Sequence, residues 1–248
     1  MQATAAREKY AKAKALFEER CKSAGVVIKR TVKDVEGIEL IKIRQPIPWG
    51  GKEYFDPMYS EAAMAAEMRG DYYVKQFLMS ELRFIDGVQS RGGLAPPSRE
   101  LDKGMEPPRR GYRFVEILTP NSSERSRCEL VLKPGEDRWE NTALSCRPVV
   151  SSSAQYALDY DDIVDPADRA LWVAGTRIKV VDKRTGEVVA QLTRYVWESG
   201  FGEASSGSWP WQHANHRVTQ TCPGVPDRLF STESRYFVDT VLIPKQGD

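Results

Sequence analysis

The sequence is poor in the residues and spacings on which metal, thiol and acid–base chemistry usually depend. It contains two histidines and four cysteines among 248 residues. No two cysteines are close enough for a CxxC metal or redox motif, and there is no G-x-S-x-G nucleophile elbow or HExxH zinc motif. Gly200 and Gly202 are not followed by the third glycine of a phosphate-binding loop. We therefore find no catalytic motif and predict no cofactor.

Long apolar runs and an excess of charge are also missing. No apolar run approaches the roughly 18 residues of a membrane-spanning helix. Residues 1–15 carry charges throughout and lack the apolar segment of a signal peptide. Lysine and arginine (36) nearly cancel aspartate and glutamate (35), so the basic excess of a nucleic-acid-binding protein is absent. We expect no nucleic-acid partner.

The four cysteines occur singly, as Cys21, Cys128, Cys146 and Cys222. An even number at wide spacing favours two structural disulfides, which persist in an oxidising compartment such as the periplasm. The lack of a signal peptide conflicts with that location. Either the chain is a mature form in which Met1 replaces a removed signal, or the thiols stay reduced in the cytosol. We favour the mature periplasmic form.

The first part of the chain predicts a helix followed by strands. A helix is expected over residues 3–24, with its apolar stripe docked onto a sheet. Two strands are expected at 26–32 and 37–44, joined as a hairpin through residues 33–36. A short helix is expected at 60–69 and extended structure over 72–85. The apolar stripe of the first helix consists of Ala6, Tyr10, Ala13, Phe17 and Cys21.

The second part of the chain predicts mostly strands that follow one another over short turns. Gly186 occupies the position where the loop of the clearest hairpin needs a left-handed residue. A helical turn is expected to open at Pro166. The expected strands are 112–118, 125–133, 147–156, 172–181, 187–197 and 235–243.

The order of elements indicates an α+β protein with a predominantly antiparallel β-sheet, an N-terminal helix packed on it and one short additional helix. We predict a single domain over residues 1–248. Residues 86–110 are rich in glycine and proline, so they are expected to form an irregular loop, and a sub-division near residue 100 stays open.

The two histidines are the main candidates for chemistry. His213 and His216 form an H-x-x-H pair, and a zinc site would need further ligands from a distant carboxylate or from Cys222. Either histidine could also act as the base for a serine or cysteine nucleophile. Surface or half-buried histidines are the more common case. The acidic run from Asp159 to Asp165 lacks the glycine and spacing of a calcium loop, so we interpret it as an acidic surface loop.

Two loops are rich in aromatic residues. One spans residues 46–59 and the other spans residues 205–211. Such side chains either pack over the protein's own sheet or contact a partner, because tryptophan is enriched at binding hot spots. The candidate partner-binding residues are Trp49, Tyr54, Phe55, Trp209, Trp211 and His213.

Several segments carry a resemblance to known proteins. Near the start they are Phe17–Gly25, Val27–Val32 and Asp34–Ile38. Later they are Trp172–Asp182, Thr185–Ala190 and Thr221–Pro223. Together these segments resemble small exported proteobacterial proteins, often lipoproteins, some of which look like immunity partners of type VI secretion phospholipase effectors. The similarity covers the first 40 residues and roughly 155–245, and it includes no catalytic motif.

The resemblance implies a periplasmic, non-catalytic inhibitor that binds and neutralises a secreted antibacterial lipase toxin. It also implies a possible lipid anchor in the precursor. Two alternatives remain at this point. One is a hydrolase with a dispersed site around His213 and His216, and the other is a structural or adaptor protein of the cell envelope.

Four cysteines allow three pairings, and we predict one of them. Cys21 lies on the apolar stripe at the end of the first helix, so its thiol is expected to face the sheet. Cys222 opens the segment that leads to the last expected strand. We therefore predict that Cys21 pairs with Cys222 and that Cys128 pairs locally with Cys146.

Overall fold

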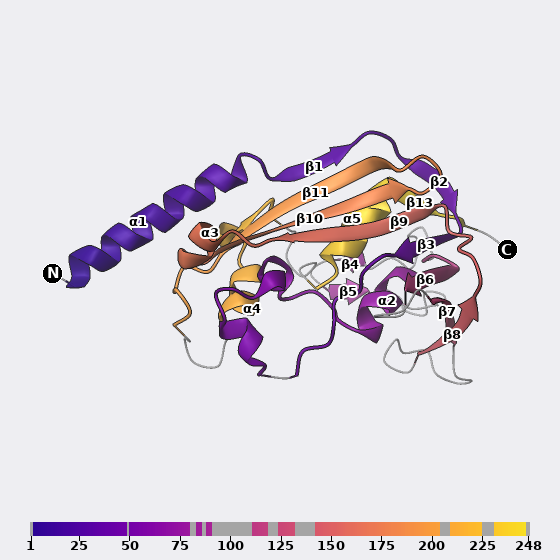
Figure 1. Ribbon diagram of the computed structural model, residues 1–248, viewed down its shortest axis with the longest axis horizontal. Helices are drawn as coiled ribbons and strands as arrows, with labels where there is room; N and C mark the ends of the chain where they lie inside the picture. The colour runs from indigo at the N-terminus through magenta and orange to yellow at the C-terminus, as the bar shows by residue number, and fades with distance from the viewer. Residues whose placement is uncertain are drawn as a thin grey trace.

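A computed structural model gives the fold of the chain (Figure 1). Within its described residues a nine-stranded sheet has the order β1-β11-β10-β9-β3-β6-β7-β8, with β12 beside β11. Most neighbours are antiparallel, whereas β3 is parallel to β6 and to β9. The prediction of an α+β fold with a mainly antiparallel sheet is confirmed. The described residues are 2–48, 50–79, 83–85, 88–90, 111–118, 124–131, 142–203, 209–224 and 231–246.

Most of the strands predicted from local patterns are present. The strand expected over 147–156 is wrong, because one strand ends at Val149, the next begins at Tyr156, and residues 150–155 between them are neither helix nor strand. The expected hairpin is formed by β10 and β11, and Gly186 has the left-handed φ of 72° that its loop needs. Two small sheets pair β2 with β13 and β4 with β5. The strands of the large sheet are β1 (Gly25–Ile28), β3 (Gly37–Leu40), β6 (Phe114–Leu118), β7 (Arg125–Val131), β8 (Ala143–Val149), β9 (Tyr156–Ile163), β10 (Val173–Asp182), β11 (Glu187–Trp197) and β12 (Thr221–Cys222), and those of the small sheets are β2 (Val32–Val35), β13 (Leu242–Pro244), β4 (Arg83–Ile85) and β5 (Val88–Ser90).

The expected hairpin between residues 26–32 and 37–44 is wrong. β1 pairs with β11 at the edge of the large sheet, β2 pairs with β13, and β3 lies between β9 and β6. All four residues of β3 are buried, which is typical of a central parallel strand covered on both faces. Each of these strands therefore pairs with strands far away in the sequence, and the hairpin that the local pattern predicted does not form.

Helices are more numerous than the sequence predicted. The extended structure expected over 72–85 is a helix at its start, and the final strand expected over 235–243 is also largely helical. Both helices bury aromatic and β-branched residues at helical spacing, and these residue types had suggested strands. The helix expected at 60–69 is a short 3-10 helix. The helices are α1 (Gln2–Cys21), η1 (Lys52–Phe55), η2 (Ser60–Met64), α2 (Asp71–Leu78), α3 (Pro166–Ala170), α4 (Pro210–Asn215), η5 (Val218–Gln220) and α5 (Glu233–Val241).

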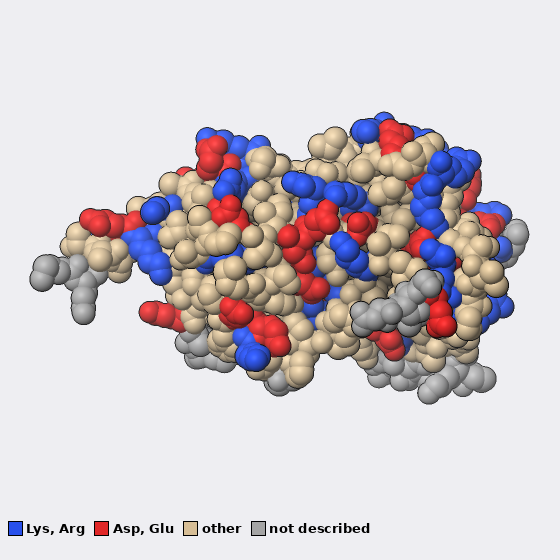
Figure 2. Space-filling view, in the orientation of Figure 1, with Lys and Arg blue, Asp and Glu red and all other residues tan. Residues whose placement is uncertain are grey.

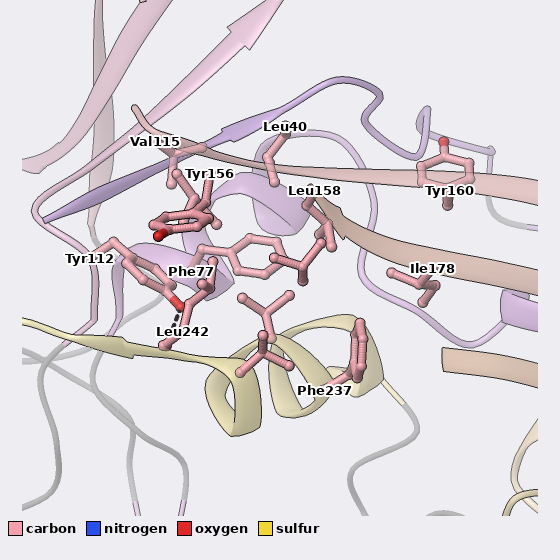
Figure 3. Packing of buried hydrophobic residues seen from close by; sticks show 14 of the residues in the cluster. Leu40, Phe77, Tyr112, Val115, Tyr156, Leu158, Tyr160, Ile178, Phe237 and Leu242 are labelled. Carbon is pink, nitrogen blue, oxygen red and sulfur yellow. Dashed lines mark hydrogen bonds between the residues drawn. The ribbon is translucent and has the colours of Figure 1, made fainter. Parts of the chain in front are cut away.

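The main apolar core lies between one face of the sheet and helices α2 and α5 (Figure 3). Phe77 of α2 and Phe237 of α5 belong to the same buried cluster as Leu158 of the sheet. The hydroxyl of Tyr112 donates a hydrogen bond of 2.7 Å to the carbonyl oxygen of Leu242, which joins the segment before β6 to β13. We call this side of the sheet the core face.

Helix α1 packs on the opposite face mainly through its second half. Ala13 and Phe17 are buried in a cluster with Tyr195 and Trp197. Tyr10 also contacts the ring of Trp197 at 5.0 Å but is 46% exposed. Figure 1 shows the first turns of α1 extending beyond the end of the sheet. The predicted docking of the apolar stripe is therefore confirmed for the second half of the helix and not for the first.

Both disulfides are present with the predicted pairing. Cys21 at the end of α1 is bonded to Cys222 in β12, and Cys128 in β7 is bonded to Cys146, which lies directly opposite it in β8. Within the described residues, no helix combines the length and the apolar character that crossing a membrane requires. The loop and sub-division expected within residues 86–110 lie outside the described residues, apart from β5.

Removing the two disulfides is expected to cost different amounts of stability. Replacing Cys21 and Cys222 by alanine should lower the free energy of unfolding by about 5 kcal/mol, and replacing Cys128 and Cys146 by about 3 kcal/mol. The first bridge spans 201 residues and the second spans 18, so the first restricts the unfolded chain more. Denaturant titration measures both values, and equal losses would contradict this explanation.

Candidate functional site

A row of polar side chains crosses the core face of the sheet. Asp162 of β9 and Arg194 of β11 lie on either side of Thr176 of β10, directly opposite it in the strand register. The hydroxyl of Thr176 donates a hydrogen bond of 2.9 Å to the carboxylate of Asp162. Side chains opposite one another in adjacent strands project from the same face, so these three form one line, which we call the polar row.

The polar row separates the main core from a second apolar cluster on the same face. Trp211 of α4 is fully buried there and stacks on Trp172 with ring centroids 5.0 Å apart. The indole N–H of Trp211 donates a hydrogen bond of 2.8 Å to the carbonyl oxygen of Asp56. This cluster therefore joins α4 to the segment around η1. It also includes Tyr54, Ala62, Ala63, Ala65, Ala174, Val196 and Ala214.

Segments that cover the sheet bring further charges to the polar row. Arg44 is fully buried, with Nη1 3.6 Å from a carboxylate oxygen of Asp162 and 3.7 Å from one of Glu61. Its guanidinium lies 4.1 Å from the ring centroid of Tyr160. None of its nitrogens has a hydrogen-bond partner among the described residues. The charge of Arg44 is therefore balanced by nearby carboxylates and an aromatic face.

Arg194 binds two covering elements at once. Its Nη1 donates to the carbonyl oxygen of Ala63 in η2 and, at 2.6 Å, to the side-chain oxygen of Asn215 in α4. The amide nitrogen of Asn215 donates to the carbonyl oxygens of Ala62 at 2.9 Å and Trp211 at 2.7 Å. A charged side chain of the sheet thus holds η2 and α4 in fixed positions.

The two aromatic loops meet on top of this arrangement. Trp209 stacks on the buried Tyr54 with ring centroids 5.0 Å apart and an angle of 6° between the planes. Phe55 and Met58 are 40% and 45% exposed beside them. His213 follows Trp209 by one turn of α4, because its N–H donates to the carbonyl oxygen of Trp209. We call the accessible part of this region, formed by Phe55, Met58, Tyr59, Trp209 and His213, the aromatic surface.

The structure divides the predicted partner-binding residues into two groups. Tyr54 and Trp211 are buried, so they support the surface and do not form it. Phe55 is exposed, and Trp209 and His213 are partly exposed. Trp49 lies outside the described residues. Packing within the protein is therefore confirmed for Tyr54 and Trp211, whereas contact with a partner stays a prediction for Phe55, Trp209 and His213.

The predicted histidine chemistry gains no support from neighbouring groups. Cys222 is bonded to Cys21 and is not available as a zinc ligand or nucleophile. Within the part of the chain that the structure describes, no group of three or more potential ligands could hold a metal ion. Burial and the neighbouring His213 lower the pKa of His216, so its imidazole is neutral near pH 7.

The acidic run from Asp159 to Asp165 is not a surface loop. Its first part belongs to strand β9, where Asp161 forms ion pairs with Lys179 and Lys42. Asp165 caps α3, and its carboxylate accepts a hydrogen bond of 2.8 Å from the N–H of Ala167. The helical turn predicted at Pro166 is confirmed.

Sequence reasoning missed the polar row and the buried charged residues that lie near it. Arg44, Glu67 and Glu233 come from three covering segments, and their charges gave no sign of burial. Arg194 carried a usable signal, because it lies within the apolar run from Val188 to Trp197 at a position that faces the core. A charge at such a position needs a buried partner.

Comparison of the chain with protein-family models, with curated proteins and with solved structures finds no match in any of the three.

Two buried carboxyl groups make stability depend on pH. Burial raises the pKa of Glu67 and of Glu233 to about 7, although Arg44 lies near both and Arg194 near Glu233. The two carboxyl groups thus hold their protons more tightly in the folded protein than in the unfolded chain, where the pKa of glutamate is near 4.5. Their contribution to stability is full below about pH 4.5 and is lost as the pH rises through about 7. The free energy of unfolding should fall by about 2 kcal/mol or more between about pH 5.5 and 8.

Urea titrations at the two pH values measure this change. The variant Glu67→Gln keeps the shape of the side chain and removes one titrating group, so its stability should depend less on pH. The exposed Glu8→Gln is the matched control and should behave as the unchanged chain. Stability that rises from pH 5.5 to 8 in the unchanged chain would contradict the prediction.

Asn215 is expected to matter more for stability than its size suggests. The variant Asn215→Ala removes a hydrogen-bond partner from the buried Arg194, so the free energy of unfolding should fall by about 2–3 kcal/mol. The exposed Thr219 lies nearby in the chain within η5, so Thr219→Ala is the control and should have little effect. A loss below about 0.5 kcal/mol for Asn215→Ala, measured by denaturant titration, would contradict the role given to this contact.

Proposed function

We propose that the protein is a binding protein that contacts another protein through the aromatic surface. The observation that carries this proposal is the exposure of Phe55 and Met58 on the segment that contains Tyr54, on which Trp209 stacks. Trp211 of α4 holds this segment at Asp56, and Arg194 of the sheet holds α4 through Asn215. Rigid aromatic side chains supply contact area at little cost in conformational entropy, and methionine is enriched at interfaces. Isolated exposed apolar residues are common, whereas Phe55, Met58 and Tyr59 come from one short segment whose Tyr54 contacts the rings of Tyr59 and Trp209.

The charge distribution is compatible with a protein partner. Figure 2 shows lysine and arginine side chains interspersed with aspartate and glutamate over the visible face, without a broad area of one sign. The formal net charge is +1. The visible face thus offers no extended basic track for nucleic acid and leaves recognition to shape, aromatic contacts and local polar pairs.

More specifically, we propose that the protein is a periplasmic immunity protein that neutralises a secreted lipase toxin. Two disulfides support an oxidising compartment. The resemblance to exported proteobacterial proteins supports the toxin partner. Inhibition of this kind needs no catalytic group, because a bound protein can cover the active site of the lipase or its membrane-facing surface.

The proposal predicts that a secreted lipase is encoded beside this protein's gene, and that lipase is the partner to test. Binding measured by calorimetry should weaken at least about tenfold for Phe55→Ala and for Trp209→Ala, because hot-spot aromatics contribute more than about 1.4 kcal/mol. Tyr236 is similarly exposed, at 48%, and belongs to α5, which contributes no residue to the aromatic surface, so Tyr236→Ala is the control and should bind normally.

Two further results bear on the proposal. The unchanged protein should abolish lipase turnover at a stoichiometric ratio, and Trp209→Ala should inhibit less. Failure of the unchanged protein to bind the lipase would overturn the immunity function. Hydrolytic activity that is lost in His213→Ala would favour the alternative of an enzyme.

A further inference from the structure

Strand β1 forms an open edge of the large sheet. Among the described residues it pairs with β11 alone, and Figure 1 shows it along the upper border. Gly25 lies opposite Thr193, Val27 lies opposite Gln191, and the N–H of Lys29 donates to the carbonyl oxygen of Val189. Backbone groups alternate in an antiparallel ladder, so those of Gly25, Val27 and Lys29 point to β11. Those of Val26 and Ile28 point away from the sheet.

The side chains of this edge are apolar and exposed on both faces. Val26 and Ile28 are 50% and 41% exposed, and they lie opposite Leu192 and Ala190, so they continue the core face. Val27 is 62% exposed on the other face. An edge strand with free backbone groups and apolar side chains readily pairs with another strand.

The other edge of the same sheet is protected. Strand β8 carries Pro148, which has no N–H to offer, and the charged Arg147. Its Cys146 is covalently tied to the neighbouring strand. These features discourage the addition of a strand. β1 has none of them within its four residues.

The outward groups of β1 are symmetric about Val27. If a second copy approaches in the antiparallel direction with its Val27 opposite this one, Val26 faces Ile28 of the second copy and Ile28 faces its Val26. Each of these pairs can exchange both of its N–H···O bonds, because both members point outward. All three cross-strand pairs are then apolar, which favours pairing.

Charged residues do not oppose this register. Lys29 falls opposite Gly25 of the second copy, and Arg30 falls opposite its Ala24. Lys29 and Arg30 are also neutralised within their own chain, by Glu187 at 3.4 Å and by Asp182 at 2.6 Å. The cations therefore meet small uncharged residues, and like charges are not placed directly opposite one another.

We propose that β1 is a self-association surface at which a second copy of this chain adds its own β1, with Val27 on the two-fold axis. The large sheet then continues from one protomer into the other. A four-residue strand pair covers less than the roughly 800 Å² per partner of a stable dimer, so we expect association only at about 10–100 μM protein. β1 and α4 lie on different sides of the molecule in Figure 1, so the aromatic surface stays accessible.

Cross-linking tests the register directly. In a non-hydrogen-bonded antiparallel pair the Cα atoms are about 4.5 Å apart, which a disulfide can span. The variant Val27→Cys should therefore form a covalent dimer with oxidised glutathione at about 100 μM protein. Val218 is similarly exposed, at 53%, and Val218→Cys should give little dimer. Equal dimer from both variants, or none from Val27→Cys, would overturn the proposal.

A second measurement avoids the added cysteine. Sedimentation of the unchanged chain should show dimer that increases with concentration. Val27→Lys should abolish it, because two ammonium groups would meet on the axis, whereas Val218→Lys should not. A chain that stays monomeric at about 500 μM would overturn the proposal. Dimer that persists in Val27→Lys would assign association to another surface. Neither result depends on the lipase, so this proposal and the immunity function can fail separately.

Discussion

The ionic contacts of Arg194 and Arg44 are the constraint on which the core face depends. A guanidinium group buried in a sheet loses its hydration, and only partners delivered by other segments can offset that loss. For Arg194 these partners lie on η2, α4 and α5, so the sheet and its covering segments are stable only together. A purely apolar face would tolerate several arrangements of such short segments. The charges favour one arrangement, because displacement of any partner leaves a buried charge unpaired.

This dependence explains how short elements can hold the aromatic surface in place. η1, η2 and α4 contain four to six residues each, too few to be stable as isolated helices. Their positions come from hydrogen bonds with one another, made by Asn215 and Trp211, and from the hydrogen bonds that Arg194 of the sheet donates to η2 and α4. A surface assembled in this way is already ordered before a partner arrives, so binding does not bear the cost of ordering it.

Local sequence signals predicted the elements that form locally. The hairpin of β10 and β11, the turn at Pro166 and the disulfide across β7 and β8 all involve residues close in sequence. Helices α2 and α5 were missed because their aromatic and β-branched side chains resemble those of strands. The place of β3 and the contacts of Arg44 depend on residues far away along the chain, so neither spacing nor composition could reveal them. The aromatic loops were recognised, but only the structure shows which side chains are accessible.

The bond between Cys21 and Cys222 turns most of the chain into a covalent ring. Only the short segments before residue 21 and after residue 222 lie outside it. A protease that cuts once inside the ring opens it without releasing a fragment, so the pieces remain joined and can stay folded. In a compartment rich in proteases, release of a fragment from the ring then requires two cuts or prior reduction of the disulfide. The bridge thus acts on the lifetime of the protein as well as on its folding equilibrium.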